Sequence, residues 1–369
     1  MADPRIEKLA QTLVDYSVAV RDGDKVVING CAIAKPLLKE IYARVLQAGG
    51  YPLLMISLPG IEEIFFRYAS DNQIQHMPKP LELITETYDV SISILAEPNT
   101  KSLSNIKPQK TVLQQRAHTE LTRMFMRRSA TGELRWIVAP YPTNAFAQDA
   151  EMGLNEYEDF VYGTCLPDMD DPVGYWHKFS AYQQNIVDWL KDKSEIHIKG
   201  PETDLHLSVS GRTFINCDGH FNMPDGEIFT GPVEDSVEGH VYFSYPAIYM
   251  GREVTGVRLW FERGKVVKAS AERGEVFLNE TLDTDTGSRF VGEFAIGTNE
   301  GIKRFTRQML FDEKIGGSFH IALGVGYPET GSKNESAVHW DMICNLRDGG
   351  EIWVDGELLY QDGKFTIDF

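Results

Sequence analysis

A change of hydrophobic pattern near residue 190 is the feature that most constrains the fold of this 369-residue chain. Before it, segments with apolar residues at helical spacing alternate with short apolar strands. After it, short runs of alternating apolar and polar residues follow one another, separated by turn signals. The two patterns require different architectures, so we expect two domains, residues 1–190 and residues 191–369.

The first half has the pattern of an α/β domain. Helices are predicted at residues 6–16, 34–48, 61–69 and 114–126, and strands at residues 25–29, 51–56, 90–95 and 134–139. Such alternation is typical of an open, mostly parallel sheet. Two further predicted helices, at residues 155–162 and 171–190, connect this domain to the second half. Their many aromatic residues, from Tyr157 to Trp189, offer weak support for a subunit interface.

The second half is predicted to be a mainly β (α+β) domain. Its predicted strands lie at residues 195–200, 204–209, 212–217, 227–232, 240–245, 257–262 and 265–270. Helical interludes are predicted at residues 274–282 and near residues 302–310. Two further strands near the end of the chain are bounded by Asp-Gly turn signals at residues 355–356 and 362–363.

Charge and cysteine usage exclude several functional classes. Lys and Arg number 36 against 54 Asp and Glu, and the formal net charge of −18 argues against a nucleic-acid or anionic-membrane partner. The four cysteines form no CxxC pair, so neither a zinc ribbon nor a redox dithiol is predicted. The N-terminal residues lack the pattern of a secretion signal, and no run of about 18 apolar residues occurs. We therefore expect a cytoplasmic protein with reduced thiols and no membrane segment.

Residues 310–344 concentrate the chemistry, with Glu313, His320, Tyr327, His339 and Asp341. His339 and Asp341 are two apart in a predicted strand, so their side chains share one face. A turn with two glycines and a proline follows the apolar run that begins at His320, and it can bring Tyr327 back over that face. Carboxylates and imidazoles in an apolar setting need a compensating cation, and residues 320–332 contain no Lys or Arg. The pattern predicts a metal site.

Two upstream glutamates are further candidates. Glu227 follows Pro-Asp-Gly where a turn leads into a strand, a position where sites are usually built, although a solvated turn acid has the same pattern. Glu293 lies in an apolar strand, so its side chain is either on a solvated face or buried and paired. Walker, HExxH and GxSxG motifs are absent, which removes the commonest nucleotide-binding, zincin and serine-hydrolase classes.

Six sequence blocks together resemble one known family, the thermophilic aminopeptidases, which include aminopeptidases T and S. The blocks are WHKFSAYQQNIVDWL, NMPDGEIFTGPVEDSVEG, GREVTGVRLWFERGKVV, GEFAIGTNEGI, LFDEKIGGSFHIALGVGYPETG and KNESAVHWDM. The resemblance runs from about residue 141 to the end, with a weaker α/β likeness before it. It implies a metallopeptidase that acts on peptides, has an N-terminal α/β domain and a C-terminal catalytic domain, binds two divalent ions and forms a homodimer.

The resemblance also implies roles for individual residues. The family's metal-binding residues match Glu227, Glu293, Glu313, His320, Tyr327, His339 and Asp341. Glu293 is then expected between the two ions or next to the attacking water, whereas Glu313 is either a ligand or the general base. Tyr327 is either a weak ligand or a hydrogen-bond donor.

The residue chemistry agrees with this assignment. Two divalent ions would neutralise the four carboxylates, and oxygen-rich sites with two imidazoles suit Zn²⁺, Co²⁺, Mn²⁺ or Mg²⁺. We therefore expect a metallo-aminopeptidase with Glu293, Glu313 and Tyr327 as its catalytic residues. The rival hypotheses are a metal-dependent hydrolase of another amide and a non-catalytic, metal-stabilised binding protein.

Overall fold

The computed structural model describes residues 3–369 and contains two compact units. One comprises the residues up to Trp176 together with Gly219–Pro224, and the other comprises His177–Asp218 and Asp225–Phe369. This division falls inside helix α9 (Pro172–Leu190), earlier in the chain than the boundary we predicted. The division into two domains, residues 1–190 and residues 191–369, remains a prediction.

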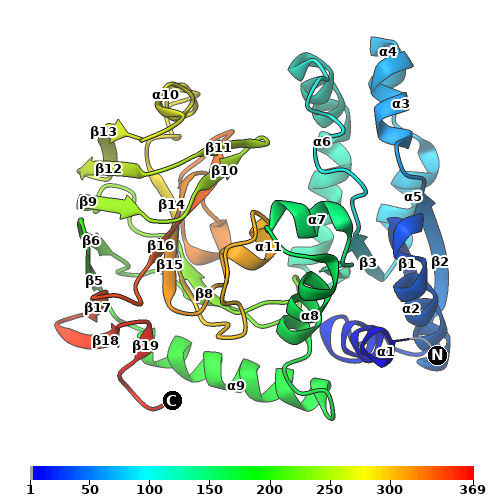
Figure 1. Ribbon diagram of the computed structural model, residues 1–369, viewed down its shortest axis with the longest axis horizontal. Helices are drawn as coiled ribbons and strands as arrows, with labels where there is room; N and C mark the ends of the chain where they lie inside the picture. The colour runs from blue at the N-terminus through cyan, green and yellow to red at the C-terminus, as the bar shows by residue number, and fades with distance from the viewer. Residues whose placement is uncertain (1–2) are drawn as a thin grey trace. The chain divides into compact units, whose positions relative to one another are not determined.

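The first unit is built on a four-stranded parallel sheet with strand order β2-β1-β3-β4, of which Figure 1 labels β1, β2 and β3. Its strands are β1 (Lys25–Cys31), β2 (Tyr51–Ser57), β3 (Val90–Leu95) and β4 (Arg135–Pro140). Its helices include α1 (Pro4–Gln11), α2 (Lys35–Gln47), α3 (Ile61–Tyr68), α4 (Asp71–Ile74), α5 (Lys79–Thr87), α6 (Pro108–Ala130), α7 (Asn144–Asp149) and α8 (Leu154–Cys165). The prediction of an open parallel α/β sheet is confirmed.

The first helix shows how local sequence sets these elements. The Asp3 side chain caps α1 by accepting a hydrogen bond from the Arg5 backbone N–H, and Pro4 occupies the first turn. Ile6 and Leu9 form its buried face. Residues Thr12–Ser17 then continue as a π-helix, which the periodicity did not distinguish from the α-helix before it.

The second unit consists mainly of antiparallel sheets, as predicted. An eight-stranded sheet has the order β13-β12-β9-β6-β5-β17-β18-β19, a five-stranded sheet has the order β16-β15-β14-β8-β7, and β10 pairs with β11. The strands are β5 (Glu195–Gly200), β6 (Thr203–Ser208), β7 (Ile215–Cys217), β8 (Glu227–Thr230), β9 (Glu238–Phe243), β10 (Ala247–Tyr249), β11 (Arg252–Val254), β12 (Val257–Glu262), β13 (Lys265–Ser270), β14 (Val291–Gly297), β15 (Ser318–Gly324), β16 (His339–Asn345), β17 (Glu351–Val354), β18 (Glu357–Gln361) and β19 (Lys364–Phe365).

Helices are few in this unit. They are α10 (Glu275–Leu282), α11 (Met309–Asp312), the 3₁₀ turn Pro328–Thr330 and the greater part of α9. The helix predicted near residues 302–310 is wrong except at its end. Arg307 has a left-handed φ of 62°, and the Asp312 carboxylate accepts hydrogen bonds from the backbone N–H and hydroxyl of Thr306. These contacts hold the segment in a turn instead of a helix.

One hydrophobic core joins the two large sheets of the second unit. Phe294, Phe319 and Trp340 from the five-stranded sheet are buried in the same cluster as Leu205 and Val241 from the eight-stranded sheet. Burial of each such side chain contributes about 1.5–3 kcal/mol. Because strand residues alternate between faces, the neighbours of these core residues on β14, β15 and β16 point to the opposite face.

Across residues 3–369, none of the helices has both the length and the apolar composition needed to span a bilayer.

Candidate metal centre

The second face of the five-stranded sheet carries acidic and imidazole side chains opposite very small residues. Alanine or glycine is the partner in the cross-strand pairs Glu293–Ala322, His320–Ala295, Asp341–Ala322, His339–Gly324 and Glu227–Gly297, whereas the other neighbouring strand places Ile343 opposite His320 and Cys217 opposite Glu227. Directly opposed Cβ atoms in an antiparallel sheet lie about 4.5–5.5 Å apart, so a bulky partner would fill the space between neighbouring strands. Alanine and glycine leave that space to the polar side chains.

Five of the predicted site residues come together on this face. His320 Nε2 lies 3.5 Å from Glu227 Oε2 and 3.5 Å from Glu293 Oε1. His339 Nε2 lies 3.5 Å from Glu293 Oε2 and 3.6 Å from Asp341 Oδ1. Each carboxylate oxygen of Glu293 therefore faces a different imidazole. Glu293 belongs to two sets of three donors, and in each set the donor atoms lie within 4.8 Å of one another.

Both imidazoles are oriented by backbone carbonyls. His320 Nδ1 lies 3.1 Å from the carbonyl oxygen of Glu313, and His339 Nδ1 lies 2.9 Å from that of Val325. Because a carbonyl can only accept, each Nδ1 carries the proton and donates it. Each Nε2 atom then faces the carboxylates and is available as a metal ligand when its ring is neutral. Metal-binding histidines are typically held in this way.

Burial and neighbouring charges shift the pKa values of Glu227, His320 and His339. Glu227, Glu293 and His320 are 6%, 5% and 1% exposed. Burial raises the pKa of Glu227 to about 8, against the opposing effect of the Lys314 charge. Burial by itself lowers the pKa of His320, but Glu293, Glu227 and Asp341 outweigh it and raise the pKa to about 10. The same balance raises the pKa of His339, with Asp341 as its main source. The raised pKa values of both imidazoles thus reflect the carboxylates that surround them.

The sequence analysis missed a buried cation in this cluster. Lys314 is fully buried, pairs with the Glu313 carboxylate, and lies 3.4 Å from Glu227 Oε1 and 3.9 Å from Asp225 Oδ1. Burial favours a lower pKa for Lys314, but the carboxylates of Glu227, Glu313 and Asp225 raise it well above the usual value. The search for a cation covered only residues 320–332. The Glu-Lys pair directly before the apolar Ile315 was the available signal.

The donor set fits divalent ions. Glu227, Glu293, Glu313, Asp341 and Asp225 supply five formal negative charges and Lys314 one positive charge, which leaves the charge of two divalent cations to be balanced. Among the described residues, the buried Glu227 Oε2 atom has no hydrogen-bond partner. An unsatisfied buried carboxylate oxygen is unfavourable, and a cation at this position would satisfy it.

The remaining two predicted residues lie at the margin of the cluster. The Tyr327 ring packs edge-on against Phe229 and His339, with centroids 5.3 Å and 5.4 Å away. Burial, followed by the charges of Glu293 and Asp341, raises the pKa of its hydroxyl. Glu313 follows the last residue of α11, and its carboxylate pairs with Lys314. Among the described residues, Glu313 belongs to neither of the two three-donor sets that contain Glu293.

The two alternatives left open for the upstream glutamates are settled by burial. Glu227 begins β8 as predicted, but the solvated turn acid is wrong because the side chain is buried. Glu293 is likewise buried, and its partners are His320 and His339. Nearby, Gln183 donates a hydrogen bond to the Glu227 backbone carbonyl, which helps to fix the start of β8.

Known proteins resemble this chain over nearly its whole length. It is 26% identical to aminopeptidase 2 of Geobacillus stearothermophilus, covering 98% of this chain and 95% of that protein. It is 30% identical to aminopeptidase T of Thermus thermophilus over 72% of each chain. The solved structure of wild-type AmpT from Thermus thermophilus superposes with a TM-score of 0.86 at 21% identity, covering 98% of this chain and 99% of that one. The model of the thermophilic metalloprotease (M29) family matches residues 2–365. The chain belongs to the thermophilic metalloprotease family.

Proposed function

We propose that this metallopeptidase is an aminopeptidase that removes the N-terminal residue from peptides with two divalent ions bound per chain. The observation that carries the proposal is the position of Glu293, whose two carboxylate oxygens each lie 3.5 Å from the Nε2 atom of a different histidine. A carboxylate shared in this way is suited to lie between two ions. The curated relatives, which are named aminopeptidases, support the substrate class.

The two donor sets define which residues would hold the ions. Glu227, Glu293 and His320 would hold one, and Glu293, His339 and Asp341 would hold the other. Tyr327 would serve as a weak ligand or a hydrogen-bond donor, and Glu313 as a further ligand or the general base. Carboxylate and imidazole donors suit Zn²⁺, Co²⁺, Mn²⁺ or Mg²⁺.

When bound at these residues, divalent ions would lower the pKa of a water molecule and polarise the scissile carbonyl. Side chains of the protein would transfer the proton and stabilise the oxyanion. Glu313 would accept the proton of the attacking water and pass it to the leaving amine if both oxygens of Glu293 hold ions, and Glu293 would do so if it lies next to the water instead. Tyr327, whose raised pKa keeps its hydroxyl protonated, donates a hydrogen bond to the developing oxyanion. The free α-amine of the peptide is recognised at the negatively charged cluster, which favours removal of terminal residues.

To test the proposal, we would measure the hydrolysis of aminoacyl p-nitroanilides by the protein after chelator treatment and again after metal is restored. We expect hydrolysis of substrates with a free α-amine, loss of activity on acetylation of that amine, and recovery only after a divalent ion is restored. Equal activity on the acetylated substrates would favour a hydrolase of another amide class. No hydrolysis, with unfolding on chelation, would favour a metal-stabilised binding protein.

Homodimerisation and a cytoplasmic location complete the proposal. The aromatic side chains between Tyr157 and Trp189 are buried or half-buried, so they give the dimer no support and the family resemblance alone motivates it. Light scattering at micromolar concentration should give twice the chain mass of 41.6 kDa. A single-chain mass would contradict the dimer.

A further inference from the structure

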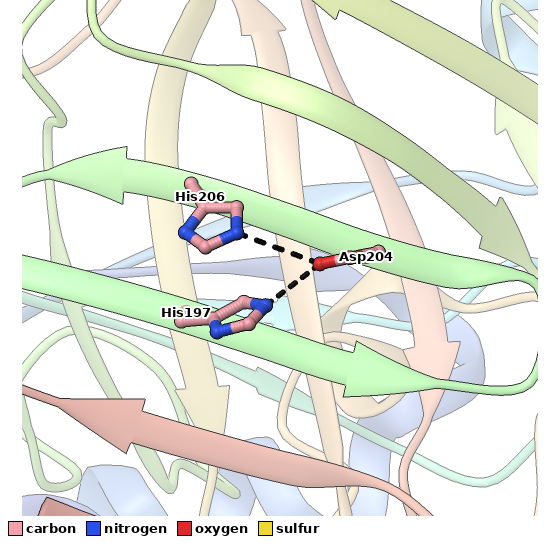
Figure 2. Close-up of side chains that lie close together, drawn as sticks. All are labelled: His197, Asp204 and His206. Atoms are coloured by element: carbon pink, nitrogen blue, oxygen red, sulfur yellow. Dashed lines mark hydrogen bonds and ion pairs between the residues drawn. The ribbon is translucent and has the colours of Figure 1, made fainter. Parts of the chain in front are cut away.

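A second cluster of donors lies on the eight-stranded sheet. His197 comes from β5, and Asp204 and His206 come from β6 (Figure 2). Asp204 and His206 are two apart and so share one face, and the register places His197 directly opposite His206. Ile196, Ile198, Leu205 and Leu207 are buried in the core on the other face. The three polar side chains therefore project away from the core.

We propose that His197, Asp204 and His206 bind a divalent transition-metal ion such as Zn²⁺. Both imidazole Nε2 atoms face the same carboxylate oxygen, Asp204 Oδ1, at 2.7 Å for His197 and 3.5 Å for His206 (Figure 2). With zinc–ligand distances of about 2.0–2.2 Å, two ligands of a tetrahedral ion lie about 3.3 Å apart. The two observed distances lie on either side of this value, and the three donor atoms lie within 4.8 Å of one another.

The two histidine rings are already arranged for a shared ion. Their centroids are 3.7 Å apart with an interplanar angle of 20°, so the rings stack and present their Nε2 atoms on the same side. Metal binding requires neutral imidazoles, and neutral rings stack without charge repulsion.

The surroundings leave room for the rest of a coordination shell. A hollow of about 250 Å³, lined among others by His197, His206 and Trp353, adjoins the cluster. On the opposite side, the register pairs Asp204 with His240 of β9. The His206 and Asp204 side chains are 54% and 58% exposed, so an ion can enter from solvent and keep water ligands. Two imidazoles and one carboxylate select Zn²⁺, Cu²⁺ or Ni²⁺ over Ca²⁺ or Mg²⁺.

A simple ion pair is the competing interpretation. In this interpretation, the contact between His197 and Asp204 provides each side chain with a partner without a metal, and His206 is not required. A metal ion requires His206 as well. Substitution of His206 therefore separates the two interpretations, and its exposure makes the change compatible with folding.

Equilibrium dialysis against micromolar Zn²⁺, followed by elemental analysis, tests the proposal. We expect the variants His206→Ala and His197→Ala/His206→Ala to bind one Zn²⁺ fewer per chain than the parent, with peptidase activity unchanged. Asp204→Asn should weaken this binding at least about tenfold. The control His76→Ala removes an exposed histidine of the first unit and should bind as many ions as the parent. The test compares the number of Zn²⁺ ions bound by the parent and by each variant. Its outcome therefore does not depend on how many ions the centre around Glu293 holds.

Cu²⁺ provides a second readout with its own spectroscopic signature. In the parent, electron paramagnetic resonance should reveal a signal with nitrogen hyperfine coupling that is missing from the His197→Ala/His206→Ala variant and retained in His76→Ala. Equal Zn²⁺ counts in the parent and the two histidine variants would overturn the proposal. So would identical Cu²⁺ spectra.

Discussion

At the scale of single residues, the centre depends on groups that are buried and still charged. Glu293 contacts both histidines of the centre, and Lys314 joins Glu227 to Glu313. Each of these side chains is costly to bury alone and acceptable only with its partners. Substitutions that change charge while preserving shape should therefore have large and distinct effects.

We expect Glu293→Gln to retain the fold and lose at least about 100-fold in kcat, because it keeps the size of the side chain and removes the negative charge with which Glu293 would hold the ions or accept the water proton. Steady-state kinetics and circular dichroism check this. The matched control is Glu280→Gln, an exposed glutamate of α10, which should behave as the parent. A near-normal kcat for Glu293→Gln would remove this residue from the mechanism.

Lys314→Met should destabilise the metal-free protein by about 3–5 kcal/mol, because it leaves the carboxylates around Glu227 without their buried cation. Added Zn²⁺ should recover part of this loss by supplying positive charge. Denaturant unfolding with chelator and with metal measures both effects. Lys303→Met, at an exposed lysine, is the control. A loss below about 1 kcal/mol for Lys314→Met would show that the ammonium does not balance the cluster.

At the scale of elements, strands such as β6 could be predicted from the alternation of buried and exposed residues, and β14 and β15, which are buried throughout, from their continuous apolar runs. The predicted strands that carry Glu293, His320 and His339 are β14, β15 and β16. The candidate site was therefore largely readable from the sequence. The convergence onto one face was not, because it depends on cross-strand register and on small partners such as Ala322. The pattern of a single strand does not reveal which residues of another strand will lie opposite it.

Two features, the buried Lys314 and the turn before α11, differ from the prediction for specific physical reasons. Lys314 was overlooked because a lysine after an acid in a polar turn usually lies in solvent, and its burial depends on Glu227, which is remote in sequence. The segment before α11 has helical composition, yet the hydrogen bonds from Thr306 to the Asp312 carboxylate hold it in a turn. A partner distant in sequence in the first case and specific side-chain bonds in the second override the local pattern.

Hydrogen bonds to the Asp285 side chain connect the segment before β14 to the segment before β16. Its carboxylate accepts hydrogen bonds from the backbone N–H groups of Gly287 and Ala337 and from the Ser288 and Ser336 hydroxyls. Burial by itself raises the pKa of Asp285, but these hydrogen bonds outweigh it and lower the pKa to about 2. The stabilisation is therefore complete above the unfolded-state pKa near 4 and is lost as the pH falls through about 2.

We expect Asp285→Asn to reduce the free energy of unfolding by about 1–2 kcal/mol at pH 7, after allowance for solvent screening. Since asparagine does not titrate, the gap between parent and variant should stay constant down to about pH 4 and narrow between about pH 4 and pH 2. Urea unfolding across this range measures the gap. A gap that is independent of pH would show that the carboxylate charge plays no part.

At the scale of the whole molecule, the predicted mixture of an α/β part and a mainly β part is confirmed, and family membership extends over both. The proposed chemistry lies entirely in residues of the second unit. The net charge of −18 is therefore partly functional, because the carboxylates of the centre contribute to it. The central claim is that one carboxylate of that unit, Glu293, is shared by two metal ions.

The most direct test of this claim is the number of Zn²⁺ ions bound per chain, measured by elemental analysis after dialysis of the parent, Glu293→Ala, His339→Ala and Asp341→Ala. Glu293 belongs to both donor sets, whereas His339 and Asp341 belong to one. The account predicts that Glu293→Ala binds two ions fewer than the parent and that His339→Ala and Asp341→Ala each bind one fewer, with the fold intact. If Glu293→Ala loses no more metal than Asp341→Ala, or if all three variants bind as much Zn²⁺ as the parent, Glu293 is not shared between two ions.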